Sequence, residues 1–332
     1  MPGERARAGG KQVRSGGRGL KETVRAAAWK PGCGVSVEWC VIRRMTIELG
    51  VPGVGGLGEV AGKLGEWQYG GVAVQVHPGD LGWFWRFGAE RTADAVRVWK
   101  RDHEILAVGL LDEPDMLRLA LAPGAFDDAE LAQQIVDDSS DPARGVLIEG
   151  TVYVDAPEGA RARDLLFKDG WDADEPWVPL ERDLAEPIED PGLAVEVIGP
   201  DQAHVRTAVQ RASFDGSTFT DERWHAMAAG TPYADARCLV GRNGRGDPVA
   251  AVTVWSAGAG KPGLIEPLGV HREFRGAGHG KAITVAAAAA LRDLGSSSAL
   301  VCTPAFNVGA VATYRTAGFQ PLPETRAQVR KA

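Results

Sequence analysis

The chain has 332 residues, long enough for two domains, and its 44% hydrophobic and 24% charged content is typical of a folded globular protein. The longest apolar run, Val285–Leu291, is far too short to span a membrane, and the four cysteines form no Cys-x-x-Cys pair, which argues against a membrane protein and a disulfide scaffold. The formal net charge of −7 argues against a general nucleic-acid binder, which needs a basic face.

Residues 1–44 differ from the rest of the chain in charge. They contain ten Lys and Arg residues but three Glu residues, so they carry +7 and the remaining residues −14. The segment is rich in glycine and has neither periodic aliphatic residues nor the apolar stretch of a secretory signal. We therefore expect a basic, disordered extension of a cytoplasmic protein. An arm for nucleic acid or another anionic surface, and a protein that starts at Met45, are the alternatives.

Residues 45–180 are predicted to form a domain of mixed strands and helices. Apolar runs and alternation predict the strands, while an acidic first turn and a terminal glycine indicate the helices. The strands are Ala95–Trp99, Ile105–Leu111 and Met116–Leu121, and the helices are Asp127–Val136 and Glu158–Lys168. Residues 181–192 are acidic, contain prolines and predict a linker.

The sequence argues against three common kinds of functional site: a dinucleotide site, a metal site and a hydrolase triad. Gly53–Gly58 fits G-x-G-x-x-G, but Pro52 directly precedes it and no clear buried strand does, so we expect a flexible glycine turn rather than a dinucleotide site. The six histidines show no i,i+4 pair and no zinc spacing, so we expect no metal. No G-x-S-x-G sequence is present to anchor a hydrolase triad.

Residues 193–332 alternate more regularly and predict a second domain. Strands are expected at Val195–Val197, Arg237–Gly241, Pro248–Trp255, Leu264–Val270 and Ser298–Thr303, and helices at Pro200–Ser213, Asp221–Ala228, Lys281–Asp293 and Val308–Ala317. The resulting order is β-α-α-β-β-β-α-β-α, followed by an extended piece after Phe319. This order predicts an α/β (α+β) fold.

One glycine-rich segment of this domain indicates a ligand. Arg275-Gly276-Ala277-Gly278-His279-Gly280 lies between an apolar strand and the helix that begins at Lys281. A helix N-terminus has unpaired N–H groups at the positive end of its dipole, and glycines let an anion approach them closely. The segment is typical of a pyrophosphate cradle, with a tight glycine turn as an equal alternative.

The strand before this segment contains a carboxylate. Glu266 interrupts the apolar run Leu264–Val270, and the alternation of a strand places it on the face of Leu264, Leu268 and Val270. Pro267 removes a ladder donor and predicts a bulge or a gap between strands. Because apolar surroundings raise the pKa of a carboxyl, Glu266 is the best candidate for a general base, with a buried carboxylate bonded to backbone as the alternative.

The helix near the C-terminus supplies the third pattern. Asn307, Ala310 and Tyr314 have spacings of three and four that keep them near one helical face, and Gly318-Phe319 follows. Together these residues resemble the GNAT acetyltransferase superfamily, whose members transfer an acyl group from acyl-CoA to an amine. Arg275-x-x-Gly278-x-Gly280 is similar to the superfamily's pyrophosphate signature, and the stretch from Asn307 to Phe319 to its last helix. The resemblance covers about residues 193–321.

The resemblance implies acetyl-CoA as co-substrate, no metal, and a mixed, mostly antiparallel sheet flanked by helices. Its pyrophosphate would bind the backbone amides of Arg275, Gly276, Ala277, Gly278, His279, Gly280 and Lys281. The pantetheine arm would pair with the backbone of Leu268, Gly269 and Val270, one of whose N–H groups would polarise the thioester carbonyl. Asn307 would bond the pantetheine, and Tyr314 would protonate the leaving thiolate, with a core aromatic as the alternative for Tyr314.

The N-terminal domain repeats part of this pattern. Ala162, Leu166, Gly170 and Trp171 have the spacing of Ala310, Tyr314, Gly318 and Phe319. Leu166 takes the tyrosine position, no glycine signature precedes the helix at Asp127, and Asp127 and Asp128 would repel a pyrophosphate. Residues 45–180 therefore resemble a degenerate GNAT domain that has lost CoA binding, in a tandem plan similar to that of mycothiol synthase and some actinobacterial antibiotic N-acetyltransferases. An unrelated α+β domain is the alternative.

The sequence thus predicts a tandem GNAT-fold N-acetyltransferase in which residues 193–332 are catalytic. The expected acceptor is a small-molecule primary amine, with Glu266 as base and Tyr314 as acid, and the negative body of the chain favours a cationic acceptor. We expect no membrane or nucleic-acid partner, and either a monomer whose halves form a pseudo-dimer or a homodimer. The alternatives are a mycothiol-synthase-like enzyme, a protein acetyltransferase, and a non-catalytic acyl-CoA sensor or interaction protein.

Overall fold

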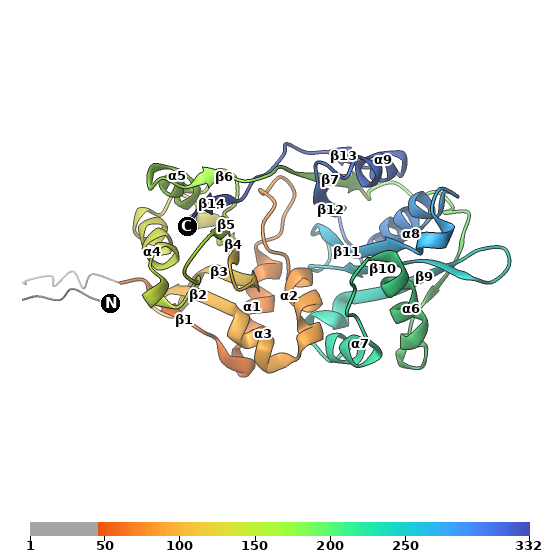
Figure 1. Ribbon diagram of the computed structural model, residues 1–332, viewed down its shortest axis with the longest axis horizontal. Coiled ribbons are helices and arrows are strands. Elements are labelled where there is room, and N and C mark those ends of the chain that lie inside the picture. The colour runs from red at the N-terminus through yellow and green to blue at the C-terminus, as the bar shows by residue number, and fades with distance from the viewer. Residues whose placement is uncertain (1–45) are drawn as a thin grey trace, which may run out of the picture. The chain divides into compact units, whose positions relative to one another are not determined.

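The computed structural model describes residues 46–332, which contain two seven-stranded sheets with helices on both faces (Figure 1). The basic extension predicted for residues 1–44 lies outside the described residues. The α-helices are α1 (Gly53–Glu66), α2 (Pro78–Phe84), α3 (Ala89–Ala95), α4 (Ala129–Ser140), α5 (Arg161–Lys168), α6 (Ala203–Ser213), α7 (Asp221–Ala228), α8 (His279–Asp293) and α9 (Val308–Thr316). Short 3-10 turns include η1 (Trp85–Phe87), η5 (Thr231–Asp235) and η6 (Arg272–Phe274).

The two sheets have the same plan. In spatial order, the N-terminal sheet contains β1 (Glu48–Gly50), β2 (Val96–Arg101), β3 (Glu104–Glu113), β4 (Met116–Leu121), β5 (Val152–Asp155), β14 (Gln328–Arg330) and β6 (Asp172–Ala173). The C-terminal sheet contains β8 (Ala194–Val197), β9 (Ala236–Arg242), β10 (Pro248–Trp255), β11 (Gly263–Val270), β12 (Ser298–Pro304), β7 (Trp177–Asp183) and β13 (Gln320–Pro321). Each sheet is antiparallel except for one parallel pair, β4–β5 or β11–β12. The mixed, mostly antiparallel fold and its internal repeat are confirmed.

The two halves exchange one strand each. The last strand of the chain, β14, lies between β5 and β6 of the N-terminal sheet, whereas β7 lies between β12 and β13 of the C-terminal sheet (Figure 1). The segment predicted as a linker over 181–192 therefore begins inside β7, where Glu181 pairs with Leu300. The strand was missed because its buried apolar residues, Val178 and Leu180, precede the predicted linker. The part of the strand inside the linker is polar, and its Arg182 forms an ion pair with Glu189. Residues 184–193 then connect β7 to β8.

The glycine turn predicted over Gly53–Gly58 is wrong, because these residues form the first turns of helix α1. Leu57, Val60 and Leu64 recur at helical spacing and are at most 1% exposed in the core. Each glycine weakens a helix by about 1 kcal/mol relative to alanine, whereas burying a leucine or valine contributes about 1.5–3 kcal/mol. Burial of this apolar face therefore outweighs the low helix propensity of the glycines.

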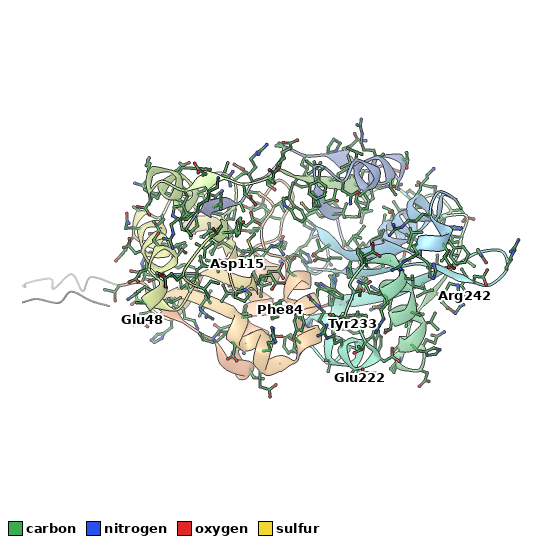
Figure 2. The ribbon with its side chains drawn as sticks, viewed as in Figure 1. Glu48, Phe84, Asp115, Glu222, Tyr233 and Arg242 are labelled. Atoms are coloured by element: carbon green, nitrogen blue, oxygen red, sulfur yellow. The ribbon has the colours of Figure 1, made fainter. Side chains whose placement is uncertain are left out.

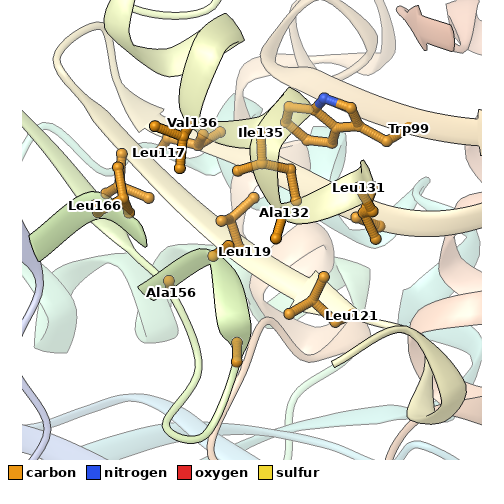
Figure 3. Packing of buried hydrophobic residues seen from close by; sticks show 14 of the residues in the cluster. Trp99, Leu117, Leu119, Leu121, Leu131, Ala132, Ile135, Val136, Ala156 and Leu166 are labelled. Carbon is orange, nitrogen blue, oxygen red and sulfur yellow. The ribbon is translucent and has the colours of Figure 1, made fainter. Parts of the chain in front are cut away.

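Each sheet is covered on both faces by a separate hydrophobic cluster. In the N-terminal half, α4 and α5 pack on the face that presents Trp99, Leu117 and Leu119 (Figure 3), while α1, α2 and α3 pack on the other. In the C-terminal half, α8 and α9 cover one face, and α6 and α7 cover the other. All these faces are closed by apolar packing, so a ligand site has to lie at strand ends or between the halves.

Helix α2 of the N-terminal half packs against the C-terminal half. Added Cβ atoms at Gly79 and Gly82 would lie 2.6 Å and 2.3 Å from the side chain of Trp255 on β10, so only glycines allow this close approach. The His77 ring, which precedes α2, is 3.2 Å from the carbonyl of Pro262 through Nε2, and the Lys261 ammonium donates to the Gly65 carbonyl at 2.6 Å. Figure 2 shows the side chains of this region, with Phe84 of α2 and Tyr233 of η5 labelled.

Candidate active site

The predicted break in the ladder is present in β11. Val252 of β10 pairs with Leu268 but Val254 pairs with Ile265, so Glu266 and Pro267 lie opposite the single residue Thr253. This is a β-bulge, and it agrees with the expectation from Pro267, which has no N–H for the ladder. The indole Nε1 of Trp255 donates to the freed Glu266 carbonyl at 2.7 Å.

The bulge corrects the face predicted for Glu266. Leu264 packs with the cluster under α6 and α7, whereas Leu268 and Val270 pack with the cluster under α8. Two residues opposite one shift the alternation of the strand by one position. Glu266 therefore shares the face of Leu264 and is separated from Leu268 and Val270, contrary to simple strand parity.

Beyond the bulge, the edge of β11 that faces β12 has no strand partner. The parallel pairing of β11 with β12 includes only Gly263 and Leu264, so the two strands separate after that point. His271 N donates to Val249 O across β10, and the alternation of an antiparallel ladder then turns the Gly269 backbone toward β10. The backbone groups of Leu268 and Val270 consequently face the gap between β11 and β12.

The N-terminus of α8 is open. Gly276 and Gly278 have φ values of +80° and +82°, which glycine adopts without strain, and Gly278 is the N-cap residue. No side chain caps the helix, whose first N–H groups therefore have no intrahelical acceptor. A Cβ at Gly280 would come within 3.1 Å of Thr313 on α9, so this glycine brings the two helices together. The arrangement provides aligned donors at the positive end of a helix dipole, which suits a phosphate.

The remaining predicted binding residues surround this helix end. Arg275, Ala277 and Lys281 are exposed, and His279 begins α8. Arg275 donates to the Ser213 carbonyl at 2.7 Å, so its side chain ties the loop to the end of α6. Asn307 is the N-cap of α9, where its Oδ1 accepts from Ala310 N at 3.2 Å.

Tyr314 lies inside α9 and is 7% exposed. Burial raises the pKa of its hydroxyl to about 12, and the neighbouring Cys302 of β12 and Glu266 of β11 act in the same direction. The tyrosine is thus protonated at neutral pH and lies among residues of the two strands that separate. Cys302, whose own pKa is raised to about 12 by burial, is a neutral thiol there.

Glu266 has the most perturbed carboxyl of this region. Burial and the neighbouring Asp80 carboxyl raise its pKa to about 8, Asp112 adds to this effect, and Arg118 opposes it. A carboxyl with a pKa close to neutrality is suited to exchange protons with a substrate. The role of Glu266 as acid–base residue stays a prediction, and the bulge corrects only its expected alignment with Leu268 and Val270.

The partners of Glu266 from the N-terminal half were missed. Asp80 belongs to α2 and Arg118 to β4, and their side chains form an ion pair at 2.8 Å. Arg118 also lies 3.7 Å from Asp112 and 3.8 Å from Asp155. The available signal was the presence of charged residues in otherwise apolar segments, as at Arg118 in Met116–Leu121, but the sequence does not show which strand of another domain they face.

The corresponding helix end in the N-terminal half is closed. Asp128 is the N-cap of α4 and its carboxylate accepts from Glu130 N at 3.1 Å and Leu131 N at 3.0 Å. Arg101 pairs with the same carboxylate at 2.6 Å, and this contact lowers the pKa of Asp128. The protein's own anion therefore fills the position that is open at α8.

The gap between β4 and β5 is also filled. Val76 N donates to Leu119 O at 3.3 Å, and Leu121 N donates to Gln75 Oε1 at 3.0 Å, so a segment of the chain satisfies this edge of β4. Leu166, at the tyrosine position, is fully buried in the cluster of Figure 3. The two last helices nevertheless end alike, because Trp171 N donates to Leu166 O and Phe319 N to Tyr314 O, each at 3.1 Å.

Residues 46–332 offer no metal cluster and no membrane-spanning helix. Within this range, His, Cys, Asp and Glu residues form no group of three or more that could hold a metal ion. Every helix described here is too short or too polar to cross a bilayer.

Comparison with known proteins agrees with this geometry. The model of the acetyltransferase (GNAT) family matches residues 207–319. A tandem GNAT protein from the clavulanic acid biosynthesis pathway is 14% identical, with a TM-score of 0.57 over 86% of this chain and 98% of that chain. A GNAT-family acetyltransferase from Colwellia psychrerythraea is 14% identical, with a TM-score of 0.56 over 86% of this chain and all (100%) of that chain. A GCN5-related N-acetyltransferase from Sphaerobacter thermophilus is 18% identical, with a TM-score of 0.52 over 78% and 95% of the two chains.

A search of curated proteins found no significant match. At these identities the structural neighbours establish the fold, and the family model establishes the kind of domain. Residues 207–319 are therefore an acetyltransferase domain of the GNAT family, in a chain that has the fold of tandem GNAT proteins.

Proposed function

We propose that the protein is an acyl-CoA-dependent N-acyltransferase that transfers acetyl from acetyl-CoA to the primary amine of a small molecule in the cytoplasm. One observation carries the proposal: the open N-terminus of α8 lies beside Val270, on the stretch of β11 that no longer pairs with β12, and Glu266 of the same strand acts on Tyr314. The helix end fits a pyrophosphate, and the amides of Leu268 and Val270 fit an extended pantetheine arm and its thioester carbonyl.

Glu266 and Tyr314 have complementary protonation states for this reaction. As the amine nitrogen bonds to the acyl carbon and the carbon–sulfur bond breaks, Glu266 accepts the amine proton and Tyr314 gives its proton to the departing sulfur. The charge of Glu266 is one cause of the raised pKa of Tyr314, so protonating Glu266 makes the tyrosine a better donor when it is needed. Exchange with water restores both side chains after product release.

The charges around Glu266 support a cationic acceptor. Asp80, Asp112 and Asp155 surround the single guanidinium of Arg118. Arg86 of η1 is also near, packed against the rings of Trp83 and Phe87 at 4.2 Å. Carboxylates outnumber cations on this side of the gap, and such a surface concentrates amines that are protonated in solution.

The test is release of free thiol from acetyl-CoA by the full chain with a panel of primary amines. Glu266→Gln is expected to lower turnover of the best amine about 10²–10⁴-fold, the usual contribution of a general base. Glu273→Gln, which removes an exposed carboxylate of η6 near the same loop, is the matched control and should retain activity. Turnover unchanged by Glu266→Gln would remove Glu266 as base, and absence of both thiol release and acetyl-CoA binding would contradict the proposed function.

A further inference from the structure

The carboxyl of Glu266 meets a carboxyl of the other half of the chain. Asp80 is a hydrogen-bond partner of Glu266, and two carboxyl groups can share such a bond when one of them holds a proton. Asp80 belongs to α2, which precedes the N-terminal sheet, whereas Glu266 belongs to the bulge of β11. The acid–base group of the GNAT domain is therefore in contact with residues outside that domain.

Asp80 is held rigidly. Its side chain is 3% exposed, Oδ2 accepts from His77 N at 2.7 Å in the capping box of α2, and Oδ1 accepts from Arg118 at 2.8 Å. The Arg118 guanidinium and the His77 N–H thus hold the Asp80 carboxylate in one place, one on each oxygen. Burial and Asp80 raise the pKa of Glu266 to about 8, so the Glu266 carboxyl holds a proton at neutral pH and can donate it to the fixed Asp80 carboxylate.

The backbones that carry the two carboxyls are fixed relative to each other. Trp255 contacts Gly79 and Gly82 of α2 and also donates its indole N–H to the Glu266 carbonyl at 2.7 Å. His77 adds a contact to Pro262 at 3.2 Å. One tryptophan thus joins the helix that carries Asp80 to the bulge that carries Glu266.

We propose that Asp80 and Arg118 are positioning residues for Glu266: the N-terminal half holds the Glu266 carboxyl and decides when it is free to accept a proton from the acceptor amine. The inference rests on the proposed function in that Glu266 acts as the base. It assigns to the degenerate half a role in catalysis in place of CoA binding. The N-terminal half would then be required for the chemistry of the C-terminal half, and not only for its stability.

Several charged or titratable groups face Glu266 from the surrounding elements. They are Asp80 on α2, Arg86 on η1, Asp112 on β3, Arg118 on β4, Cys302 on β12 and Tyr314 on α9. Cys302 and Tyr314 keep their protons across the neutral range and contribute no charge there. Among the remaining groups Asp80 and Arg118 form the closest ion pair. Asp80 raises the pKa of Glu266 and Arg118 lowers it.

These opposite directions give the experiment its design. In Asp80→Asn the negative neighbour is lost, so Glu266 should lose its proton at lower pH than in the wild type. In Arg118→Gln the positive neighbour is lost, so Glu266 should hold its proton to higher pH. Each change is expected to be about one pH unit or more, as is usual when a nearby charge is removed. Arg118→Lys keeps the charge and should restore a titration close to that of the wild type.

The measurement is ¹³C NMR titration of the full chain labelled at the glutamate carboxyl carbon, with the Glu266 signal assigned by its loss in Glu266→Gln. It needs no acceptor and therefore does not depend on the enzymatic assay. Asp128→Asn is the matched control, because it breaks a comparable arginine–aspartate pair of the N-terminal half at the closed end of α4 and should not move the signal. The pH profile of thiol release, recorded with the best amine, should move in the same directions.

The outcomes separate this inference from the proposed function. Titrations of Glu266 that move in opposite directions in Asp80→Asn and Arg118→Gln support the positioning role. Titrations that do not move, or that move together, overturn it even when both variants lose activity. If the titrations move as expected while Glu266→Gln keeps full turnover, the coupling stands and the assignment of Glu266 as base fails.

Discussion

The two halves of the chain have the same strand order, but they differ at the gap between their two central parallel strands: it is open in one half and filled in the other. In the C-terminal half the gap between β11 and β12 is bordered by free backbone groups and an uncapped helix. In the N-terminal half Gln75 and Val76 satisfy the edge of β4, and Asp128 caps α4. A fold of this kind is thus stable with the gap filled by its own polar groups, whereas binding requires that those groups be left without partners.

The comparison also shows what a half loses and what it retains. The core packing and the helix end with Gly170 and Trp171 persist in the N-terminal half, since they hold the sheet together. At the positions that correspond to Gly278 and Tyr314, the N-terminal half has the carboxylate of Asp128 and the side chain of Leu166. The surface facing the other half carries the ion pair of Asp80 and Arg118, and both charges act on Glu266 in the bulge of β11.

The exchanged strands β7 and β14 make each half depend on the other. Disrupting the pairing of β14 should therefore give the largest loss in the free energy of unfolding. Val329→Pro removes a ladder N–H from β14, which is paired on both sides by β5 and β6, and should cost about 3 kcal/mol or more. Lys331→Pro, just after the strand, is the control and should cost little. Urea denaturation of both variants measures the difference, and equal free energies of unfolding would show that β14 is dispensable.

A single substitution can make the open N-terminus of α8 resemble the closed N-terminus of α4. Gly278→Asp places a carboxylate at the N-cap of α8, where Asp128 stands in α4, and aspartate tolerates the positive φ better than most residues. Affinity for CoA should fall about a hundredfold, or about 2.8 kcal/mol, because the added charge repels the pyrophosphate.

The neutral variant Gly278→Asn separates charge from shape. Asparagine has the size of aspartate and tolerates the same backbone conformation. The affinity of this variant for CoA should fall only about tenfold, or about 1.4 kcal/mol. Titration calorimetry with CoA compares the two. Equal affinities of the aspartate and asparagine variants would contradict an electrostatic cradle at this helix end.

The smallest effect at neutral pH concerns the contact between the halves. Burial lowers the pKa of His77 to about 4, so the folded protein keeps this ring neutral while the unfolded chain takes up a proton near pH 6.5. The folded state then binds fewer protons, and stability is lost as the pH falls from about 6.5 to 4, by about 1.4 kcal/mol for each pH unit. In His77→Gln this part of the pH dependence should disappear, which urea denaturation at several pH values would measure. An unchanged slope would show that His77 titrates normally.

Local patterns predicted much of the fold and part of the site. Strands of the C-terminal half, the helix at Lys281 and the bulge at Pro267 follow from alternation, glycine position and the missing proline N–H. Long-range effects were missed for physical reasons. Leu57, Val60 and Leu64 stabilise α1 through tertiary packing despite its glycines, and the bulge separates the face of Glu266 from that of Leu268 and Val270.

The exchange of β7 and β14 was beyond sequence reasoning because both strands have the same alternation whichever sheet they join. The partners of Glu266 were missed for a related reason. Asp80 and Arg118 are far from it in sequence, and only the docking of α2 on Trp255 brings them together.

We propose that the C-terminal half of this chain binds acyl-CoA and that the N-terminal half is closed to it. Isothermal titration calorimetry of the full chain with acetyl-CoA and with CoA tests this most directly. The account predicts one site per chain, whose affinity falls in Gly278→Asp. Two sites per chain, or one site that is unaffected by Gly278→Asp, would contradict it.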